Sequence, residues 1–201
     1  MRIGIFGGTF DPVHLGHLLL AESAREQRGL DEVWFVPAAE PPHKRNCRRT
    51  EARHRVEMLK LAVGGHEAFR VCELEIERGG VSFTVETLEQ IGRSHPEATL
   101  FLLVGADTLA DLPNWREPAR VCELALPTAV GRPGSPPPDV AVLGALVTAA
   151  RLAEIEAAAV EMPLVGISAT DLRSRAASGR SLRYRTPRAV ERYIETHGLY
   201  R

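Results

Sequence analysis

The sequence has few cysteines and lysines, no long apolar run and no excess of charge of one sign. Its three cysteines, Cys47, Cys72 and Cys122, form no CxxC pair, which argues against a disulfide framework or a structural zinc site and favours the reducing cytoplasm. The formal net charge is -1, whereas a protein that binds nucleic acid usually has a basic excess. We therefore expect no nucleic acid among its partners.

No stretch approaches the roughly 18 to 20 consecutive apolar residues that a membrane-spanning helix needs. The start, MRIGIFGGTF, has one basic residue and a short apolar run that ends in glycines, which matches a signal peptide poorly. We therefore expect a cytoplasmic protein with no membrane partner. The chain has 201 residues, of which 44% are hydrophobic, and this suffices for one domain with a sizeable core.

Short apolar segments alternate with segments of helical periodicity along the chain. The predicted strands are residues 2–6, 32–36, 69–76, 99–104, 126–130 and 160–164. The predicted helices are residues 15–27, 50–63 with Thr50 as N-cap, 82 or 84 to 94, 105–112, 117–124, 140–159, 168–178 and 187–197. This alternation predicts the α/β class, with an open, doubly wound, mostly parallel sheet. Ligands bind beyond the carboxyl ends of such strands, so functional residues are expected in the loops that follow them.

The first such loop reads GGTFDPVHLGH, residues 7–17, and opens the first predicted helix. Glycines let the backbone approach a ligand closely, and a helix start suits phosphate. His14 and His17 are three residues apart, so both imidazoles can face one ligand, and Gly16 keeps the space between them open. Taken alone, two such histidines are more often surface or core residues. A metal site would need further ligands, and none is evident nearby in sequence.

The second loop reads ISATDLRSR, residues 167–175, and opens a helix near the end of the chain. Ser168 or Thr170 can cap this helix, whose free N–H groups again suit phosphate. Arg173 lies one turn into the helix and can present a planar fork to phosphate oxygens. Taken alone, the segment also fits an ordinary capped helix with a solvated arginine.

Together, the two loops resemble the HxGH nucleotidylyltransferase superfamily, in which an ISxTxxR element closes the ATP site. The resemblance implies a Rossmann-like fold in one domain, residues 1–201, with residues 168–201 as a C-terminal helical segment that closes the ATP site. It implies that His14, His17 and Arg173 are catalytic, with the two histidines contacting the triphosphate. The ATP-binding residues that it implies are Gly7, Gly8, Thr9, Phe10, Gly16, Arg132, Ser168 and Thr170.

Further segments resemble the nicotinate-mononucleotide adenylyltransferases of bacteria. These segments are PAAEPPHK at 37–44, SFT at 82–84, GADTL at 105–109 followed by Trp115, and RPG at 132–134. The resemblance implies that the mononucleotide contacts Lys44, Thr84, Asp107 and Trp115. The chain departs from the family pattern in three places, with alanines at 38 and 39 where asparagines are usual and Phe83 in place of a tyrosine.

Three of these implied contacts also have a physical argument and an ordinary alternative. Lys44 can reach a phosphate as a compact point charge, or it is a solvated loop charge. Trp115 can stack on a flat, cationic pyridinium ring, or it fills the edge of the core. Asp107 follows the predicted central strand, where ligand contacts are common, or it caps the next short helix.

The resemblance implies that the phosphate of nicotinate mononucleotide attacks ATP, giving deamido-NAD and pyrophosphate. Mg²⁺ would be carried with ATP, without a dedicated protein site for the metal. Bound phosphates should favour protonated histidine and so raise the imidazole pKa. Two alternatives remain open: the same chemistry with nicotinamide mononucleotide or phosphopantetheine as acceptor, and a noncatalytic nucleotide-binding regulator. The sequence also leaves open a homo-oligomer.

Overall fold

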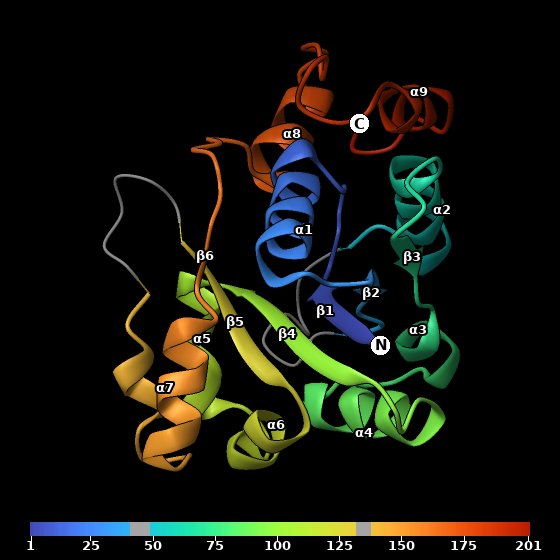
Figure 1. Ribbon diagram of the computed structural model, residues 1–201. Helices are drawn as coiled ribbons and strands as arrows, with labels where there is room; N and C mark the ends of the chain where they lie inside the picture. The colour runs from blue at the N-terminus through green and yellow to red at the C-terminus, as the bar shows by residue number, and fades with distance from the viewer. Residues whose placement is uncertain (41–48, 132–137) are drawn as a thin grey trace.

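Six parallel strands form the centre of the computed structural model, which describes residues 1–40, 49–131 and 138–201 (Figure 1). The strand order is β3-β2-β1-β4-β5-β6, so the chain winds outward from β1 in both directions. The strands are β1 (Arg2–Gly8), β2 (Glu32–Pro37), β3 (Phe69–Val71), β4 (Thr99–Gly105), β5 (Leu126–Gly131) and β6 (Val160–Glu161). Each strand pairs in parallel with its neighbours. The predicted doubly wound α/β sheet is therefore confirmed.

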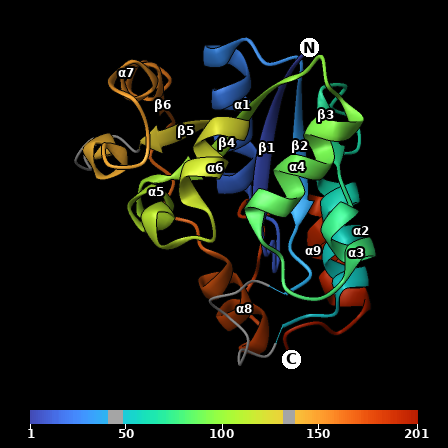
Figure 2. The same cartoon turned by 90° about the horizontal axis from the view of Figure 1, so that it is seen from below.

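Helices cover both faces of this sheet (Figures 1 and 2). One apolar cluster joins the sheet to α1 (Leu15–Arg28), α2 (Ala52–Val63), α8 (Ala169–Ala177) and α9 (Arg188–Thr196). The second cluster joins it to α4 (Thr84–Ser94), α5 (Ala106–Asp111), α6 (Pro118–Leu124) and α7 (Ala149–Ala157). The shorter elements are α3 (Leu74–Arg78), η2 (Leu112–Asn114) and η3 (Val140–Leu143). No helix in the described ranges is long and apolar enough to cross a bilayer.

The central strands bury side chains on both faces, as the continuous apolar run at 99–104 predicts. In β4, Phe101 and Leu103 pack in the first cluster, while Leu100, Leu102 and Val104 pack in the second. Full burial of one such side chain stabilises the fold by about 1.5–3 kcal/mol. These two strips of apolar side chains hold β1 and β4 side by side and place their carboxyl ends together.

Two predicted elements before α4 exist, but with different bounds. The strand predicted at 69–76 ends at Val71, and α3 occupies Leu74–Arg78. Alternation of apolar and polar residues over so short a segment does not distinguish a strand from a short helix. The helix buries Glu75 against the hydroxyl of Thr87 in α4. The helix predicted to start at Thr50 starts at Ala52, with Glu51 as N-cap. Thr50 instead belongs to the preceding loop, where its backbone N–H donates to Asp11.

The alanine-rich stretch 140–159 is divided rather than one helix. It forms η3 and then α7, and the side chain of Thr148 caps α7 by accepting a hydrogen bond from the backbone of Arg151 at 3.2 Å. The Arg151 guanidinium donates from Nε and Nη2 to the carbonyl of Cys122, at 3.1 and 2.9 Å. The stretch therefore fastens the end of α6 beside the crossover from β5 to β6. The strand that follows is shorter than the predicted 160–164, because it ends at Glu161 before Pro163.

Candidate active site

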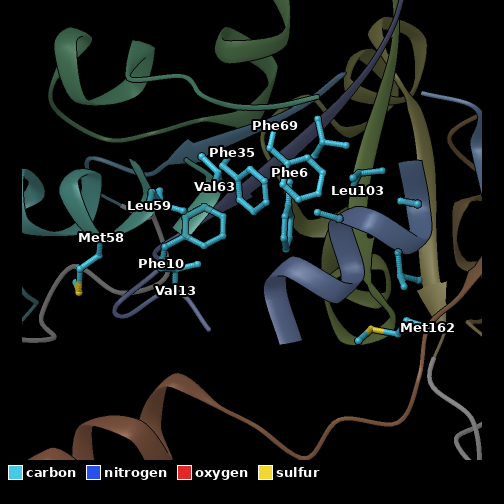
Figure 3. Packing of buried hydrophobic residues seen from close by; sticks show 14 of the residues in the cluster. Phe6, Phe10, Val13, Phe35, Met58, Leu59, Val63, Phe69, Leu103 and Met162 are labelled. Carbon is cyan, nitrogen blue, oxygen red and sulfur yellow. The ribbon is translucent and has the colours of Figure 1, made fainter. Parts of the chain in front are cut away.

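The loop after β1 passes over a group of aromatic rings (Figure 3). The ring of Phe10 is 2% exposed and lies 5.4 Å from the ring of Phe6 and 5.8 Å from that of Phe35, centroid to centroid. Phe10 has a positive φ of 48°, which turns the backbone and sends the ring into the core. A Cβ at Gly8 would lie 2.9 Å from this ring, so glycine is required there. The resemblance implied that Phe10 binds ATP. In the structure, its ring is buried in the core and supports the loop.

His14 and His17 cap the start of α1 for each other. The backbone N–H of His14 donates to Nδ1 of His17 at 3.2 Å, and the backbone N–H of His17 donates to Nδ1 of His14 at 3.3 Å. The two rings stack with their centroids 3.6 Å apart. Because Nδ1 accepts in each case, the proton of each neutral ring lies on Nε2. The fold therefore fixes two parallel imidazoles in the tautomer that carries Nε2–H.

Gly16 leaves the space that this stacked pair needs. A Cβ at Gly16 would lie 3.1 Å from Nδ1 of His14 and 3.2 Å from its Cε1. These separations are tighter than ordinary van der Waals contact, so the His14 ring would have to move. The glycine between the histidines therefore serves the geometry of the pair.

When no ligand is bound, the surroundings of His17 favour the uncharged form of its ring. Burial, followed by the proximity of His14, holds the pKa of His17 well below the ordinary value of 6.5. The ring centroid of Phe10 lies 5.1 Å away on one side and that of Phe6 6.0 Å away on another. Burial disfavours the charged imidazolium, as does a second imidazole in contact. His17 can thus offer a hydrogen-bond donor without carrying a full positive charge.

Arg173 joins the two sequence motifs by a hydrogen bond to Asp11, which is 162 residues away in the sequence. Its Nη1 donates to the backbone carbonyl of Asp11 at 2.8 Å, and its Nη2 donates to the hydroxyl of Thr170 at 3.2 Å. Ser168 is the N-cap of α8, and its hydroxyl accepts from the backbone N–H of Asp171 at 3.1 Å. Ser168 thus has the predicted capping role, while Thr170 helps to orient the arginine instead.

Asp11 is tied to the end of the chain and to the start of α2. Its Oδ1 accepts a hydrogen bond from the hydroxyl of Tyr200 at 2.6 Å, and its Oδ2 accepts one from the backbone N–H of Thr50 at 3.1 Å. Burial, together with the carboxylate of Asp11, raises the pKa of Tyr200, so this hydroxyl stays protonated as a donor. The carboxylate therefore holds two distant segments against the loop.

Arg55 holds the same loop from α2. Only 2% of this arginine is exposed, and its Nη1 donates to the carbonyl of Thr9 at 3.0 Å while its Nε donates to the carbonyl of Thr50 at 3.1 Å. Sequence reasoning missed Arg55 and Tyr200 as supports of the site. A signal was present for Arg55, because it lies three and four residues before Met58 and Leu59 and so shares the apolar face of the predicted helix.

A cavity of about 320 Å³ opens at the carboxyl ends of β1 and β4. Segments distant in sequence line it. They include the glycine loop, which starts at Gly7 and Gly8, the start of α4 and the turn before α6. Of the predicted site residues, it brings together Gly7, Gly8, Thr9, Thr84 and Trp115. Thr108 lies among the lining residues, whereas Asp107 does not and is exposed on the first turn of α5. Lys44 and Arg132 fall outside the described residues.

The wall of this cavity formed by α3 and α4 contains a buried carboxyl group. The hydroxyl of Thr87 donates to Oε1 of Glu75 at 2.6 Å, and burial raises the pKa of Glu75. The Ser82 hydroxyl accepts a hydrogen bond from the backbone N–H of Ala39 at 3.0 Å. The loop in which Ala38 and Ala39 replace the usual asparagines is thus held here through a backbone N–H group rather than through a side chain.

A second hollow, of about 360 Å³, lies beside Asp11, which is among its lining residues. Arg173 is among the residues that line this hollow. Three arginines and one histidine line it together with two carboxylates; these residues are Arg49, Arg173, Arg201, His54, Asp11 and Glu51. The cationic groups make this hollow suitable for anionic ligands.

Comparison with known proteins places these features in a family context. The cytidylyltransferase-like family matches residues 5–175. A protein of Thermus thermophilus named "Probable nicotinate-nucleotide adenylyltransferase" is 47% identical over 201 residues, covering 100% of both chains. One of the same name from Thermomicrobium roseum is 46% identical, covering 100% of this chain and 92% of its own.

A solved structure has the same fold. The nicotinic acid mononucleotide adenylyltransferase of Plasmodium falciparum, complexed with NaAD, superposes with a TM-score of 0.74. The superposition covers 99% of this chain and 97% of that chain, at 17% sequence identity.

The electrostatics of the histidine pair predict the titration of His17. In the absence of ATP, its ring should titrate well below pH 6.5, and in His14→Asn its pKa should rise while staying below 6.5, because burial remains. The neutral ring should stabilise the fold above pH 6.5, and this contribution should decrease as the pH falls from 6.5 towards the folded-state pKa. NMR titration of the ring protons, assigned with His17→Asn, measures both values. An ordinary or raised pKa for His17 in the free protein would contradict the burial argument.

Proposed function

The chain belongs to the cytidylyltransferase-like family and, within it, to the nicotinate-nucleotide adenylyltransferases, and we propose that it transfers AMP from ATP to nicotinate mononucleotide. The products are deamido-NAD and pyrophosphate. One observation carries the proposal: the loop that leads to the stacked histidine pair accepts a hydrogen bond from Arg173 at the carbonyl of Asp11, and the start of the same loop lines the cavity that contains Thr84 and Trp115. One region of the protein thus has groups for a triphosphate next to a pocket for a flat ring.

The reaction needs alignment and charge neutralisation more than it needs a base. The attacking phosphate of the mononucleotide is already an anion, so neither a serine nor a cysteine nucleophile is required. Correct alignment of two reactants can lower a barrier by up to roughly 7–11 kcal/mol. In our proposal, the glycine loop aligns the two phosphates, and α8 with the chain end, residues 168–201, closes the ATP side.

The groups proposed to stabilise the transition state are preorganised donors. The Nε2–H groups of His14 and His17 and the guanidinium of Arg173 face charge that builds on the bridging oxygen and on the departing pyrophosphate. Because hydrogen bonds and stacking already fix these side chains, they need little reorganisation when the reaction occurs. An anionic triphosphate would also favour a proton on His17, against the burial that lowers the pKa in the free protein.

Mg²⁺ is proposed to enter with ATP rather than to reside in the protein. Within the ranges that the structure describes, no group of three or more histidine, cysteine or acidic side chains could hold a metal ion. A metal bound mainly by phosphates and water needs few protein ligands. When bound, it would neutralise part of the triphosphate charge.

The acceptor ring is proposed to lie between Trp115 and the start of α4. The indole N–H of Trp115 donates to Oδ2 of Asp111 at 3.3 Å, which orients the ring. A pyridinium is flat and cationic, so it stacks favourably on an indole. Thr84 is the first residue of α4, and a helix start favours the carboxylate of a nicotinate ring.

The direct test is pyrophosphate release with ATP, Mg²⁺ and a panel of acceptors. Nicotinate mononucleotide should give deamido-NAD, with kcat/KM at least about tenfold above that of nicotinamide mononucleotide. Phosphopantetheine should give no product. Equal values for the two mononucleotides, or a preference for the amide, would contradict the acceptor assignment. Binding of ATP without turnover on any acceptor would indicate a noncatalytic regulator instead.

His17→Asn should lower kcat by about two or more orders of magnitude, as loss of a preorganised donor does in other enzymes. The asparagine amide can replace Nδ1 as acceptor for the His14 backbone N–H, so the free energy of unfolding should change by less than about 1 kcal/mol. Steady-state kinetics and urea unfolding measure the two effects. The matched control is His66→Asn, because His66 lies on the surface beside Glu22 and should leave kcat unchanged. Normal turnover in folded His17→Asn would remove His17 from the mechanism.

Arg173→Ala should weaken ATP binding more than mononucleotide binding, because the guanidinium lies at the start of α8 and lines the hollow beside Asp11. Calorimetric titration with each ligand separately provides the comparison. Arg175→Ala is the control on the same helix, since its Nε donates to the carbonyl of Ser181 and it should leave both affinities unchanged. An equal loss for ATP and mononucleotide in Arg173→Ala would place Arg173 outside the ATP site.

A further inference from the structure

Arg116 lies at the mouth of the cavity of about 320 Å³ in which the acceptor ring is proposed to bind, here called the acceptor cavity. It follows Trp115 in the turn before α6 and is among the residues that line the cavity. Half of its side chain is exposed, so the guanidinium lies at the boundary between cavity and solvent. Neither the sequence motifs nor the adenylyl transfer chemistry requires a cation here.

The guanidinium of Arg116 rests on the ring of Phe83. Its Cζ lies 4.8 Å from the ring centroid, within the range of a cation–π contact. Phe83 stands where the sequence motif usually has a tyrosine, and it precedes Thr84 at the start of α4. The phenyl ring thus serves as the platform that places a cation next to this helix start.

Two positive features therefore meet at one point of the cavity. The helix α4 has 11 residues, and the partial positive charge at its N-terminus favours anions. The Arg116 cation lies beside the same turn because it contacts Phe83, the N-cap residue. A carboxylate on the acceptor ring would be attracted by both features.

The acidic groups around Arg116 orient the guanidinium without using all of its donors. Its Nη1 donates to Oε1 of Glu86 at 2.8 Å, and its Nε lies 3.6 Å from Oε1 of Glu117. A guanidinium has five N–H donors in a fixed plane, so donors remain beyond the one given to Glu86. Glu75, the acidic residue in the cavity lining, accepts its hydrogen bond from Thr87.

A neutral amide would gain less from this arrangement than a carboxylate. Both groups could accept a charge-assisted hydrogen bond from the guanidinium, but only the carboxylate adds the attraction between opposite charges. The NH₂ group of an amide would in addition place donors against the donors of Arg116, which leaves polar groups unpaired.

We propose that Arg116 is a specificity-determining residue of the acceptor pocket, where its guanidinium on Phe83 selects a ring that bears a carboxylate over the same ring bearing a neutral amide. The inference rests on the proposed function and names a side chain that sets its acceptor choice. In this proposal, the charge of Arg116 acts together with the N-terminus of α4. Mutation of Arg116 separates the two contributions.

The test compares kcat/KM for nicotinate and nicotinamide mononucleotides in the wild type, Arg116→Ala and Arg116→Lys. We expect Arg116→Ala to lower the acid-to-amide ratio about tenfold, through loss of activity with the acid alone. Arg116→Lys should retain an intermediate ratio, because it keeps a charge but loses the planar fork. Rising salt should lower the ratio in the wild type more than in Arg116→Ala, because an exposed charge is screened.

The matched control is Arg120→Ala. Arg120 lies on α6, pairs with Glu123 at 2.9 Å and is not among the residues that line the cavity. This variant should keep the wild-type ratio. Both arginines are about half exposed, so neither substitution should unfold the protein, and urea unfolding verifies this.

The outcomes distinguish this proposal from the function on which it rests. An unchanged ratio in Arg116→Ala, or an equal loss with both acceptors, would overturn the role of Arg116 and leave the adenylyl transfer standing. If the wild type forms no dinucleotide from either acceptor, the proposed function fails, and the role of Arg116 fails with it.

Discussion

The buried carboxylate and carbonyl of Asp11 are the point on which the rest of the site depends. Arg173 donates to the carbonyl, while Tyr200 and the backbone of Thr50 donate to the carboxylate. A buried charge is tolerated when it is hydrogen-bonded in this way. These bonds join the first loop of the chain to α8, to the chain end and to the start of α2. They thereby fix where Arg173 lies relative to the histidine pair.

The same loop makes the histidines donors rather than permanent cations. Each ring uses Nδ1 to cap α1 for the other, and burial keeps the pKa of His17 low. A neutral pair can stack closely in the free protein, whereas two imidazolium ions would repel each other. In the proposed site, positive charge near the substrates comes instead from arginines, with Arg173 assigned to the triphosphate and Arg116 to the acceptor ring. The proposed site thus uses the imidazoles of the histidine pair as preorganised donors and arginines as fixed charges, at different positions.

Local patterns predicted the sheet, the loop at residues 7–17 and a cap of α8 at Ser168 or Thr170, because each depends on residues close together in the sequence. The contacts that complete the site are not local. Arg55 and Tyr200 reach the first loop from distant elements, and no local pattern identifies their partners. Residues 69–76 alternated as a strand does, but the burial of Glu75 against Thr87 is a tertiary contact that favours a helix there. Likewise, the motif containing Asp107 predicted the right turn, but it is Thr108 that lines the cavity.

The central claim is that the acceptor phosphate attacks ATP directly, with donors aligned by the first loop and with no covalent enzyme intermediate. Exchange of radiolabelled pyrophosphate into ATP tests this claim most directly. We predict that the purified protein with ATP and Mg²⁺ exchanges no label until nicotinate mononucleotide is added, and that exchange then begins. Exchange in the absence of any acceptor would reveal an adenylyl-enzyme and contradict the account.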